Sequence, residues 1–202
     1  MRTGRFSPFR RVLSVVVACI LVTSLTACTG RGGGQLPPGA GFTGAASFGF
    51  SFSCEDSGGL NPGTGRLHIE LSYNDKGSNP IGSAFSIHGI VDTIDPVLES
   101  MICIGQNPPP DGNRLIFLGR YYLTSSPPSG FPSTCPTRDN SAAPMCRFEV
   151  IVQDNDKNRA PSAGDSFQIT LSGGTALTSE LASETVFYTR GGLLASGNVT
   201  VG

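Results

Sequence analysis

Residues 47–54 read "SFGFSFSC" and carry the clearest structural pattern of the chain. Every second side chain is a phenylalanine, with serine or glycine between them. Strict alternation of apolar and small polar residues is typical of a β-strand that buries one face. The stretch therefore predicts a strand that turns Phe48, Phe50 and Phe52 towards a core and leaves Gly49 and its serine neighbours outside.

The same period of two, or a short continuous apolar run, recurs along the rest of the chain. About eight strands with turn-rich links, each with one buried face, predict an all-β fold, either an antiparallel β-sandwich or a closed β-barrel. A short extra strand at 101–105 and a helical turn at 176–183 are weaker patterns. The further strand-like stretches are 66–73, 84–91, 114–123, 146–153, 166–172, 184–190 and 193–201.

The N-terminus has the features of an export signal. Residues 1–27 carry four arginines and no acidic residue, and the apolar run 12–25 is shorter than the ~20 residues of a membrane span. A basic start, a short apolar region and small residues before a cut describe a secretory signal peptide. The residues "LTAC", 25–28, resemble the lipobox of bacterial lipoproteins, which implies cleavage before Cys28 and acyl chains on it. The alternative is an ordinary signal peptide cut near Ala27.

The segment behind that cysteine predicts a spacer. Residues 28–43 contain three consecutive glycines and a Pro-Pro pair, which suit a flexible tether between a lipid anchor and an all-β domain at 44–202. We therefore expect an extracytoplasmic, lipid-anchored protein of the cell envelope. Thr29 is not the aspartate that resembles an inner-membrane retention signal, which favours the outer membrane if the host has one.

The charge balance argues against one class of partner. Removing the four signal arginines from the 14 basic residues leaves 10 against 15 acidic residues, a net charge of about −5. A nucleic-acid binder would show a basic face, so we expect no nucleic-acid partner.

The cysteines predict disulfides. Of six cysteines, one lies in the signal and Cys28 is the anchor, which leaves four in an exported chain. An even count favours two bridges, with three possible pairings. We favour Cys135–Cys146, which closes a short proline-rich loop, and Cys54–Cys103.

Several segments in order resemble the post-COAP domain of exported bacterial proteins. They are "GFTGAASFGFSFS" at 41–53, "GRLHIELSYND" at 65–75, a strand into an Asp-Asn turn followed by "AGDSFQITLS", and "GGLLASGNVTV" at 191–201. The resemblance implies an extracytoplasmic β-domain, often an accessory module, and it brings no catalytic residue. The four cysteines and the proline-rich loops near 108 and 127 depart from that pattern.

The turn after residue 153 has the spacing of a calcium loop. Its candidate ligands are Asp154, Asp156, Asn158 and Asp165, at positions 1, 3, 5 and 12 of the run. Arg159 stands where such a loop needs glycine, and strands rather than helices flank it. The alternative interpretation is a β-hairpin loop whose Asp and Asn residues cap turns.

Two histidines suggest a second metal hypothesis. His68 and His88 both face away from the predicted core, and pairing of their strands around the turn at 74–80 would place them nearly opposite, with Glu70 beside them. Imidazole suits zinc, copper or nickel. The alternative is two unrelated surface histidines.

Enzyme signatures are absent: the chain has neither G-x-S-x-G nor H-E-x-x-H. We therefore expect a surface-anchored envelope lipoprotein with a non-catalytic binding or accessory β-domain, no obligate cofactor, and a protein or glycan ligand. The alternatives are a hydrolase accessory or weak carbohydrate- or peptide-processing domain, and a purely structural envelope protein. A flat or grooved sheet face with aromatic residues would favour binding.

Overall fold

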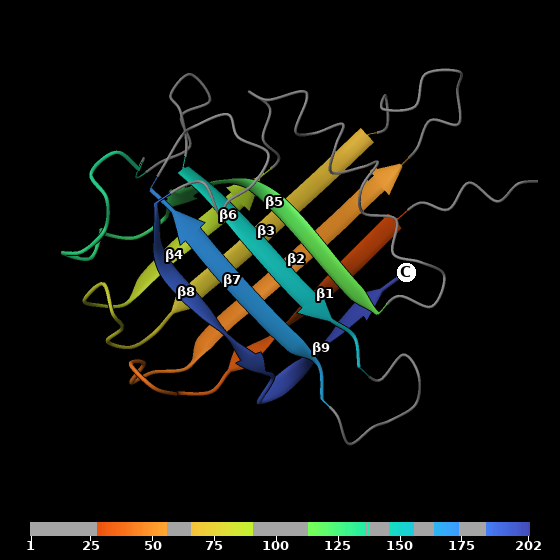
Figure 1. The fold of residues 1–202 in the computed structure, drawn as a ribbon, viewed down its shortest axis with the longest axis horizontal. Helices are drawn as coiled ribbons and strands as arrows, with labels where there is room; N and C mark the ends of the chain where they lie inside the picture. The colour runs from red at the N-terminus through yellow and green to blue at the C-terminus, as the bar shows by residue number, and fades with distance from the viewer. Residues whose placement is uncertain are drawn as a thin grey trace, which may run out of the picture.

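The computed structural model describes residues 28–55, 66–90, 113–135, 137, 146–155, 164–173 and 185–202. The described residues form nine strands in one antiparallel sheet and no helix, which confirms the all-β prediction (Figure 1). The strands are β1 (Cys28–Leu36), β2 (Ala46–Glu55), β3 (Arg66–Asp75), β4 (Phe85–Ile90), β5 (Arg114–Leu123), β6 (Cys146–Gln153), β7 (Ser166–Ser172), β8 (Val186–Leu193) and β9 (Ser196–Val201).

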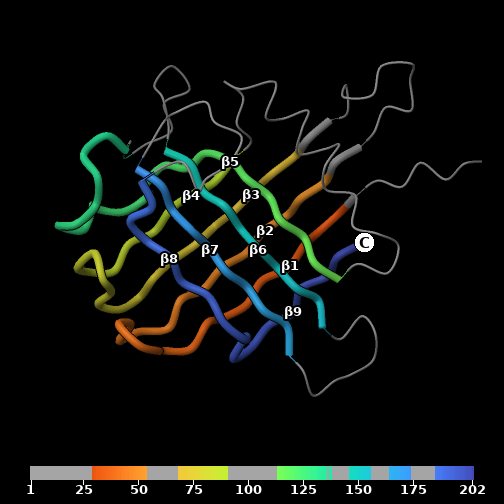
Figure 2. Tube along the Cα trace, in the orientation of Figure 1, coloured from red at the N-terminus to blue at the C-terminus, as the bar shows by residue number. Residues whose placement is uncertain are grey.

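The sheet is a meander that curls on itself into a half-barrel. Strands β1 to β8 pair in sequence order, while β9 leaves β8 and pairs with β1 at the other edge. In Figure 2 the strands β5 to β8 cross in front of β1 to β3. The C-terminus lies beside the start of β1, where the amide of Thr29 donates to the carbonyl of Gly202 at 2.8 Å. A single curled sheet is closer to the barrel alternative than to a two-sheet sandwich.

Aromatic rings fill the space between the two halves of the sheet. Phe48 of β2 stacks on Phe167 of β7 with ring centroids 3.7 Å apart, and Phe85 of β4 meets Tyr188 of β8 at 5.0 Å. The phenylalanine face of β2 is buried as its alternation predicts. Each such side chain contributes about 1.5–3 kcal/mol when fully buried, so this interior holds the curled sheet together without tryptophan.

The prediction of a flexible tether over 28–43 is wrong for its first nine residues, because they form β1 between β2 and β9. The glycines are needed there for close packing. A Cβ added at Gly32 would lie 2.6 Å from the carbonyl oxygen of Asn198, and one added at Gly34 would lie 2.6 Å from that of Ser196. Glycine lets the two backbones approach, and it also removes the apolar alternation by which a strand is recognised. Residues 28–36 are therefore part of the folded sheet.

The two sides of the curled sheet meet along a line that we call the seam, with β6 to β8 on one side and β1 and β9 on the other. Side-chain carboxylates hold one end of this seam. The Asp165 carboxylate accepts the amide of Val199 at 2.7 Å, and the Asp154 carboxylate accepts the amide of Val201 at 3.1 Å. Both carboxylates are buried. Two main-chain amides on the outer edge of β9 thus donate to side-chain carboxylates instead of to a neighbouring strand. This part of the sheet edge is therefore not open for pairing.

The disulfide between Cys135 and Cys146 is confirmed, with Cα atoms 5.3 Å apart. The predicted Cys54–Cys103 bridge lies outside the described residues: Cys103 is not among them, and of Cys54 only the backbone is, opposite Cys28 on the ladder. The signal segment 1–27 and the stretches 101–105 and 176–183 also lie outside. Among the residues that the structure describes, no helix has the length and apolar character needed to cross a membrane.

Candidate functional site

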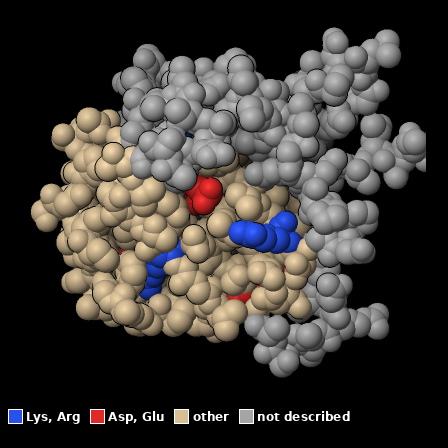
Figure 3. All heavy atoms as spheres, in the orientation of Figure 1, with Lys and Arg blue, Asp and Glu red and all other residues tan. Residues whose placement is uncertain are grey.

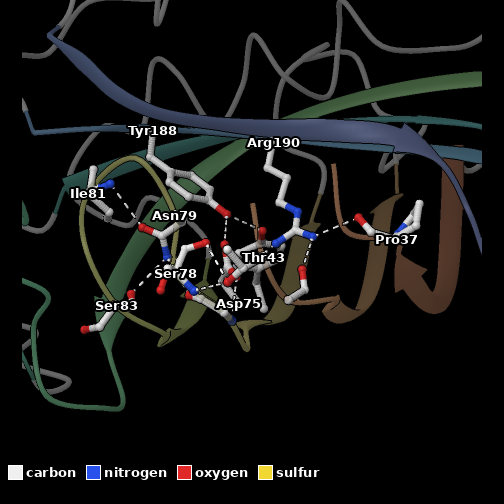
Figure 4. Close-up of polar contacts among 12 residues, drawn as sticks. Pro37, Thr43, Asp75, Ser78, Asn79, Ile81, Ser83, Tyr188 and Arg190 are labelled. Carbon is white, nitrogen blue, oxygen red and sulfur yellow. Dashed lines mark hydrogen bonds and ion pairs between the residues drawn. The ribbon is translucent and has the colours of Figure 1, made fainter. Parts of the chain in front are cut away.

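A buried polar cluster lies at the end of the half-barrel where β3 stops. Figure 4 shows Tyr188 and Arg190 of β8 pointing at Asp75, the last residue of β3. The Tyr188 hydroxyl donates to Asp75 Oδ2 at 2.7 Å, and Arg190 Nη1 lies 2.9 Å from Asp75 Oδ1. That nitrogen makes no aligned hydrogen bond, so its contact with the carboxylate is mainly electrostatic. The Tyr73 hydroxyl meets that of Tyr188 at 2.5 Å.

The same arginine ties β8 to the loop between β1 and β2. Arg190 Nη2 donates to the carbonyls of Pro37 at 3.0 Å and Gly44 at 2.7 Å, and its guanidinium lies 4.5 Å from the centroid of the Phe42 ring. Arg190 and the carboxylates of Asp154 and Asp165 therefore latch opposite ends of one seam.

Both tyrosines of this cluster are held in the neutral form. Burial is the main cause that raises the pKa of Tyr73, and the nearby Asp75 adds to it. Burial also raises the pKa of Tyr188, and the neighbouring Tyr73 adds to it. Because Asp75 is fully buried and Arg190 is 4 % exposed, no substrate reaches the cluster, and its role is structural.

The outer face of β2, β3 and β4 carries a shallow depression of about 250 Å³. We call it the Gly49 depression, because Gly49 lies at its floor in the middle of β2. Its outward-facing lining comes from three strands, and the backbone of Phe50 and Leu71 completes it. The outward residues are Gly49, Ser51, Glu70, Ser72 and His88.

Strand register places the floor of the depression in a row that crosses the sheet. Gly49 is the partner of Gly33 on β1 and of Ser72 on β3, and Ser72 is the partner of His88 on β4. The row continues to Asn198 of β9 at one end and to Tyr122 of β5 at the other. Same-face partners lie ~5 Å apart, so the row is a track across the strands with a glycine floor.

Nothing in the described part of the fold requires glycine at position 49. Among the described residues, a Cβ added there would meet only the carbonyl oxygen of Gly32, at 4.0 Å, and Gly49 has no positive φ. The inward glycines differ: a Cβ at Gly89 would meet the Phe148 ring at 2.6 Å. A strand-interior glycine without a packing reason often marks close approach of a ligand.

His88 and Glu70 form the polar pair at one wall of the depression. Nε2 of His88 lies 3.1 Å from Glu70 Oε2, and both side chains are partly exposed. The Tyr122 ring lies beside His88 with centroids 5.3 Å apart. The wall thus combines a carboxylate and an imidazole, and a phenol ring lies next to it beyond His88.

The predicted pairing of His68 with His88 is wrong. The register sets His88 opposite Ser72, and His68 opposite Ser53. The cause is the turn: the chain reverses between Asn79 and Gly82, whose amides and carbonyls bond to each other, later than the sequence suggested. Within the described ranges, no three His, Cys, Asp or Glu side chains gather as metal ligands.

The residues of the calcium hypothesis divide between two regions. Asp154 and Asp165 are engaged with amides of β9, and Asp165 Oδ1 also accepts the amide of Asn155 at 3.0 Å. Asp156 and Asn158 lie outside the described residues. The predicted hairpin between β6 and β7 is confirmed, and its two described carboxylates serve the seam.

A second hollow, of about 500 Å³, lies on the outer face of β5 to β8 beside Arg114 and Gln153. On the face seen in Figure 3, charged side chains of the described residues are few and scattered. Burial raises the pKa of the half-buried Glu149 on β6, while the charge of Arg114 lowers it. The one phenylalanine among its lining residues, Phe167, turns its side chain inward.

Sequence reasoning found His88 and Glu70 but not the depression they line. The available signal was Gly49 itself, a glycine on the outward face of a strong strand. No family model, no curated protein and no solved structure matches this chain. The resemblance to the post-COAP domain stays a prediction.

Proposed function

We propose that this protein is an envelope lipoprotein, anchored through Cys28, whose β-domain is a non-catalytic binding module. The Gly49 depression carries the proposal, because it is a shallow, solvent-open site with a polar pair, Glu70 and His88, at its wall and the Tyr122 ring next to His88. The lipobox-like residues 25–28 and the accessory character implied by the post-COAP resemblance support the location.

The distance along β1 between Cys28 and Gly33 is compatible with a lipid anchor and a binding site on the same domain. Cys28 is the first residue of β1, and Gly33 lies five residues further on. At a rise of about 3.4 Å per residue, the row through Gly33 stands ~17 Å from the anchor. The headgroup layer on each side of a bilayer is only ~5–8 Å thick, so the depression lies beyond it without a spacer when β1 runs away from the membrane.

The depression suits binding better than hydrolysis. Among the described residues that line it, Glu70 is the one carboxylate, and His88 already contacts it. Glycoside hydrolysis commonly uses two carboxylates about 5–9.5 Å apart. Release of a cleaved product from any bound ligand would contradict the non-catalytic role.

The anchor is tested by labelling cells that express the full chain with radioactive palmitate. The wild-type chain is expected to carry label and to sediment with membranes. The Cys28→Ser variant is expected to lose the label and leave the membrane fraction, because two or more acyl chains are what hold it there. Equal labelling of the two chains would overturn the lipoprotein proposal.

The binding role is tested with the chain from residue 28 onward, which contains the nine described strands and carries Cys28→Ser for solubility. Immobilised, it is expected to retain a component of envelope extract. The Gly49→Leu variant, which fills the depression, is expected to retain much less. Retention that is equal for both chains would remove the Gly49 depression as the site.

A further inference from the structure

We infer that the ligand of the Gly49 depression is an oligosaccharide lying across strands β1 to β4. This inference rests on the proposed function. It would follow the row from Gly33 through Gly49 and Ser72 to His88. The chain of sugars would run across the strands, with its middle ring in the Gly49 depression.

The size and shape of the depression fit one unit of a longer chain. Pockets that enclose a small molecule are commonly roughly 300–1,000 Å³, and this depression, about 250 Å³, is smaller and open. The glycine floor continues to Gly33 on β1, where a side chain is also absent. An extended ligand can therefore leave the depression along the row rather than end in it.

The rows on either side of the floor carry hydroxyl, carboxylate and amide groups. Ser51 and Glu70 are partners on one side, and Ser47 and Asn74 are partners on the other. Residues two apart on a strand lie about 6.8 Å apart, so both rows reach a ligand on the floor. Short polar side chains suit a ligand with hydroxyls along both rims. The Glu70 carboxylate supplies a charge-assisted hydrogen bond, which is stronger than a neutral one.

The row beyond the depression supplies the apolar part of sugar recognition. Tyr122 is the partner of His88, and the two rings lie 5.3 Å apart at their centroids. A sugar ring has C–H groups on its faces and hydroxyls on its rim. A phenol ring with one apolar face and a polar end matches that pattern.

The surface chemistry disfavours a protein ligand at this place. Protein interfaces depend on buried aromatic or apolar anchors near the centre of the contact. Among the described residues, the large apolar side chains that are exposed are Val186 and Leu193, both on β8, and neither lines the Gly49 depression. Glycine and serine on the floor and a carboxylate at the wall favour a polyhydroxylated ligand.

The test uses the chain from residue 28 onward with Cys28→Ser, a glycan array, and calorimetric titration with chitotetraose, cellotetraose, xylotetraose and mannotetraose. We expect the array or at least one tetrasaccharide to show saturable binding without cleavage. Gly49→Leu is expected to weaken it more than tenfold. Glu70→Gln is expected to weaken it about tenfold, since a charge-assisted bond becomes neutral.

Thr189→Leu is the control, because it places the same leucine side chain at an exposed position of β8, away from the Gly49 depression, and should leave binding unchanged. Circular dichroism and thermal melting of each variant separate lost binding from lost folding. If the Gly49→Leu variant melts at a lower temperature than the wild type, the Glu70→Gln variant alone tests the site. The Glu70 side chain is half exposed, so this substitution should not disturb folding.

The possible outcomes separate this inference from the proposed function. Glycan binding that Gly49→Leu abolishes supports both. Capture of an envelope protein through the Gly49 depression, with no binding to any glycan, overturns the oligosaccharide inference and leaves the binding role intact. Glycan binding unaffected by Gly49→Leu and Glu70→Gln overturns the assigned site. No binding of any kind overturns both.

Discussion

Replacing Arg190 by methionine tests the seam latch most sharply. In the native protein the guanidinium lies 2.9 Å from Asp75 Oδ1 and donates to the carbonyls of Pro37 and Gly44. Methionine keeps an unbranched apolar stem but removes the charge and every donor. Asp75 would then be a fully buried carboxylate whose partners are the Tyr188 hydroxyl and the Gly77 amide.

The expected cost follows from that burial. Breaking a buried ion pair by removing one partner costs about 3–5 kcal/mol, because the remaining charge is uncompensated. For a chain of this size, each kcal/mol lowers Tm by about 2–4 °C. We therefore expect Tm to fall by about 6–20 °C. Since native domains are stable by only about 5–15 kcal/mol, this variant keeps a small margin.

The assay is urea unfolding and thermal melting of the wild type, Arg190→Met, Asp75→Asn and the double variant. Arg31→Met is the matched control, since Arg31 is exposed on β1 and should change stability by less than about 0.5 kcal/mol. The double variant should be less destabilised than the sum of the single variants, with a coupling of about 1–3 kcal/mol. Additive single effects, or a loss below about 1 kcal/mol for Arg190→Met, would refute the latch.

Three further outcomes follow from the same contacts. Because burial raises the pKa of Tyr73 and Tyr188 above their unfolded value of ~10, the unfolded chain releases two protons that the native protein keeps. Stability should therefore fall by ~2.7 kcal/mol per pH unit above pH ~10, and half as steeply in Tyr73→Phe. Ionisation is followed by absorbance at 295 nm while the pH is raised. If all four tyrosines ionised near pH ~10 while the protein is still folded, the raised pKa values would be contradicted. Gly32→Ala should destabilise by about 1–3 kcal/mol through overpacking, whereas Gly49→Ala should stabilise by about 0.5–1 kcal/mol; equal effects on urea unfolding would contradict the two glycine roles. Asp165→Ala should lower stability by about 2–4 kcal/mol, since two amides lose their acceptor, and millimolar Ca²⁺ should leave the Tm of the wild type unchanged. A rise in Tm with Ca²⁺ would restore the calcium hypothesis.

Alternation predicted eight of the strands because their inward residues are large. The phenylalanines of β2 and the apolar face of β6 show a period of two that no other structure produces. Alternation did not predict β1, because its inward positions are glycines such as Gly32. The role of these glycines depends on the backbone of β9 lying against them. That contact joins residues far apart in the sequence, so no local pattern contains it.

The polar residues were predictable in type but not in partner. Asp154 and Asp165 have calcium-loop spacing, yet they accept amides of β9 because the returning C-terminal strand brings unpaired donors beside them. His88 and Glu70 were placed near each other, but the turn between Asn79 and Gly82 shifted the register and separated His68. Side-chain roles of this kind depend on tertiary register, which the composition of a turn does not determine.

Two-dimensional ¹H–¹⁵N NMR of the labelled chain, titrated with an oligosaccharide that the array retains, shows where the sugar binds. We expect the amides that shift most to be those of Gly33, Gly49, Ser51, Glu70 and Ser72, on three adjacent strands of the outer face. Shifts confined to β5 to β8, or no shifts at saturating sugar, would contradict the assignment of the Gly49 depression as the binding site.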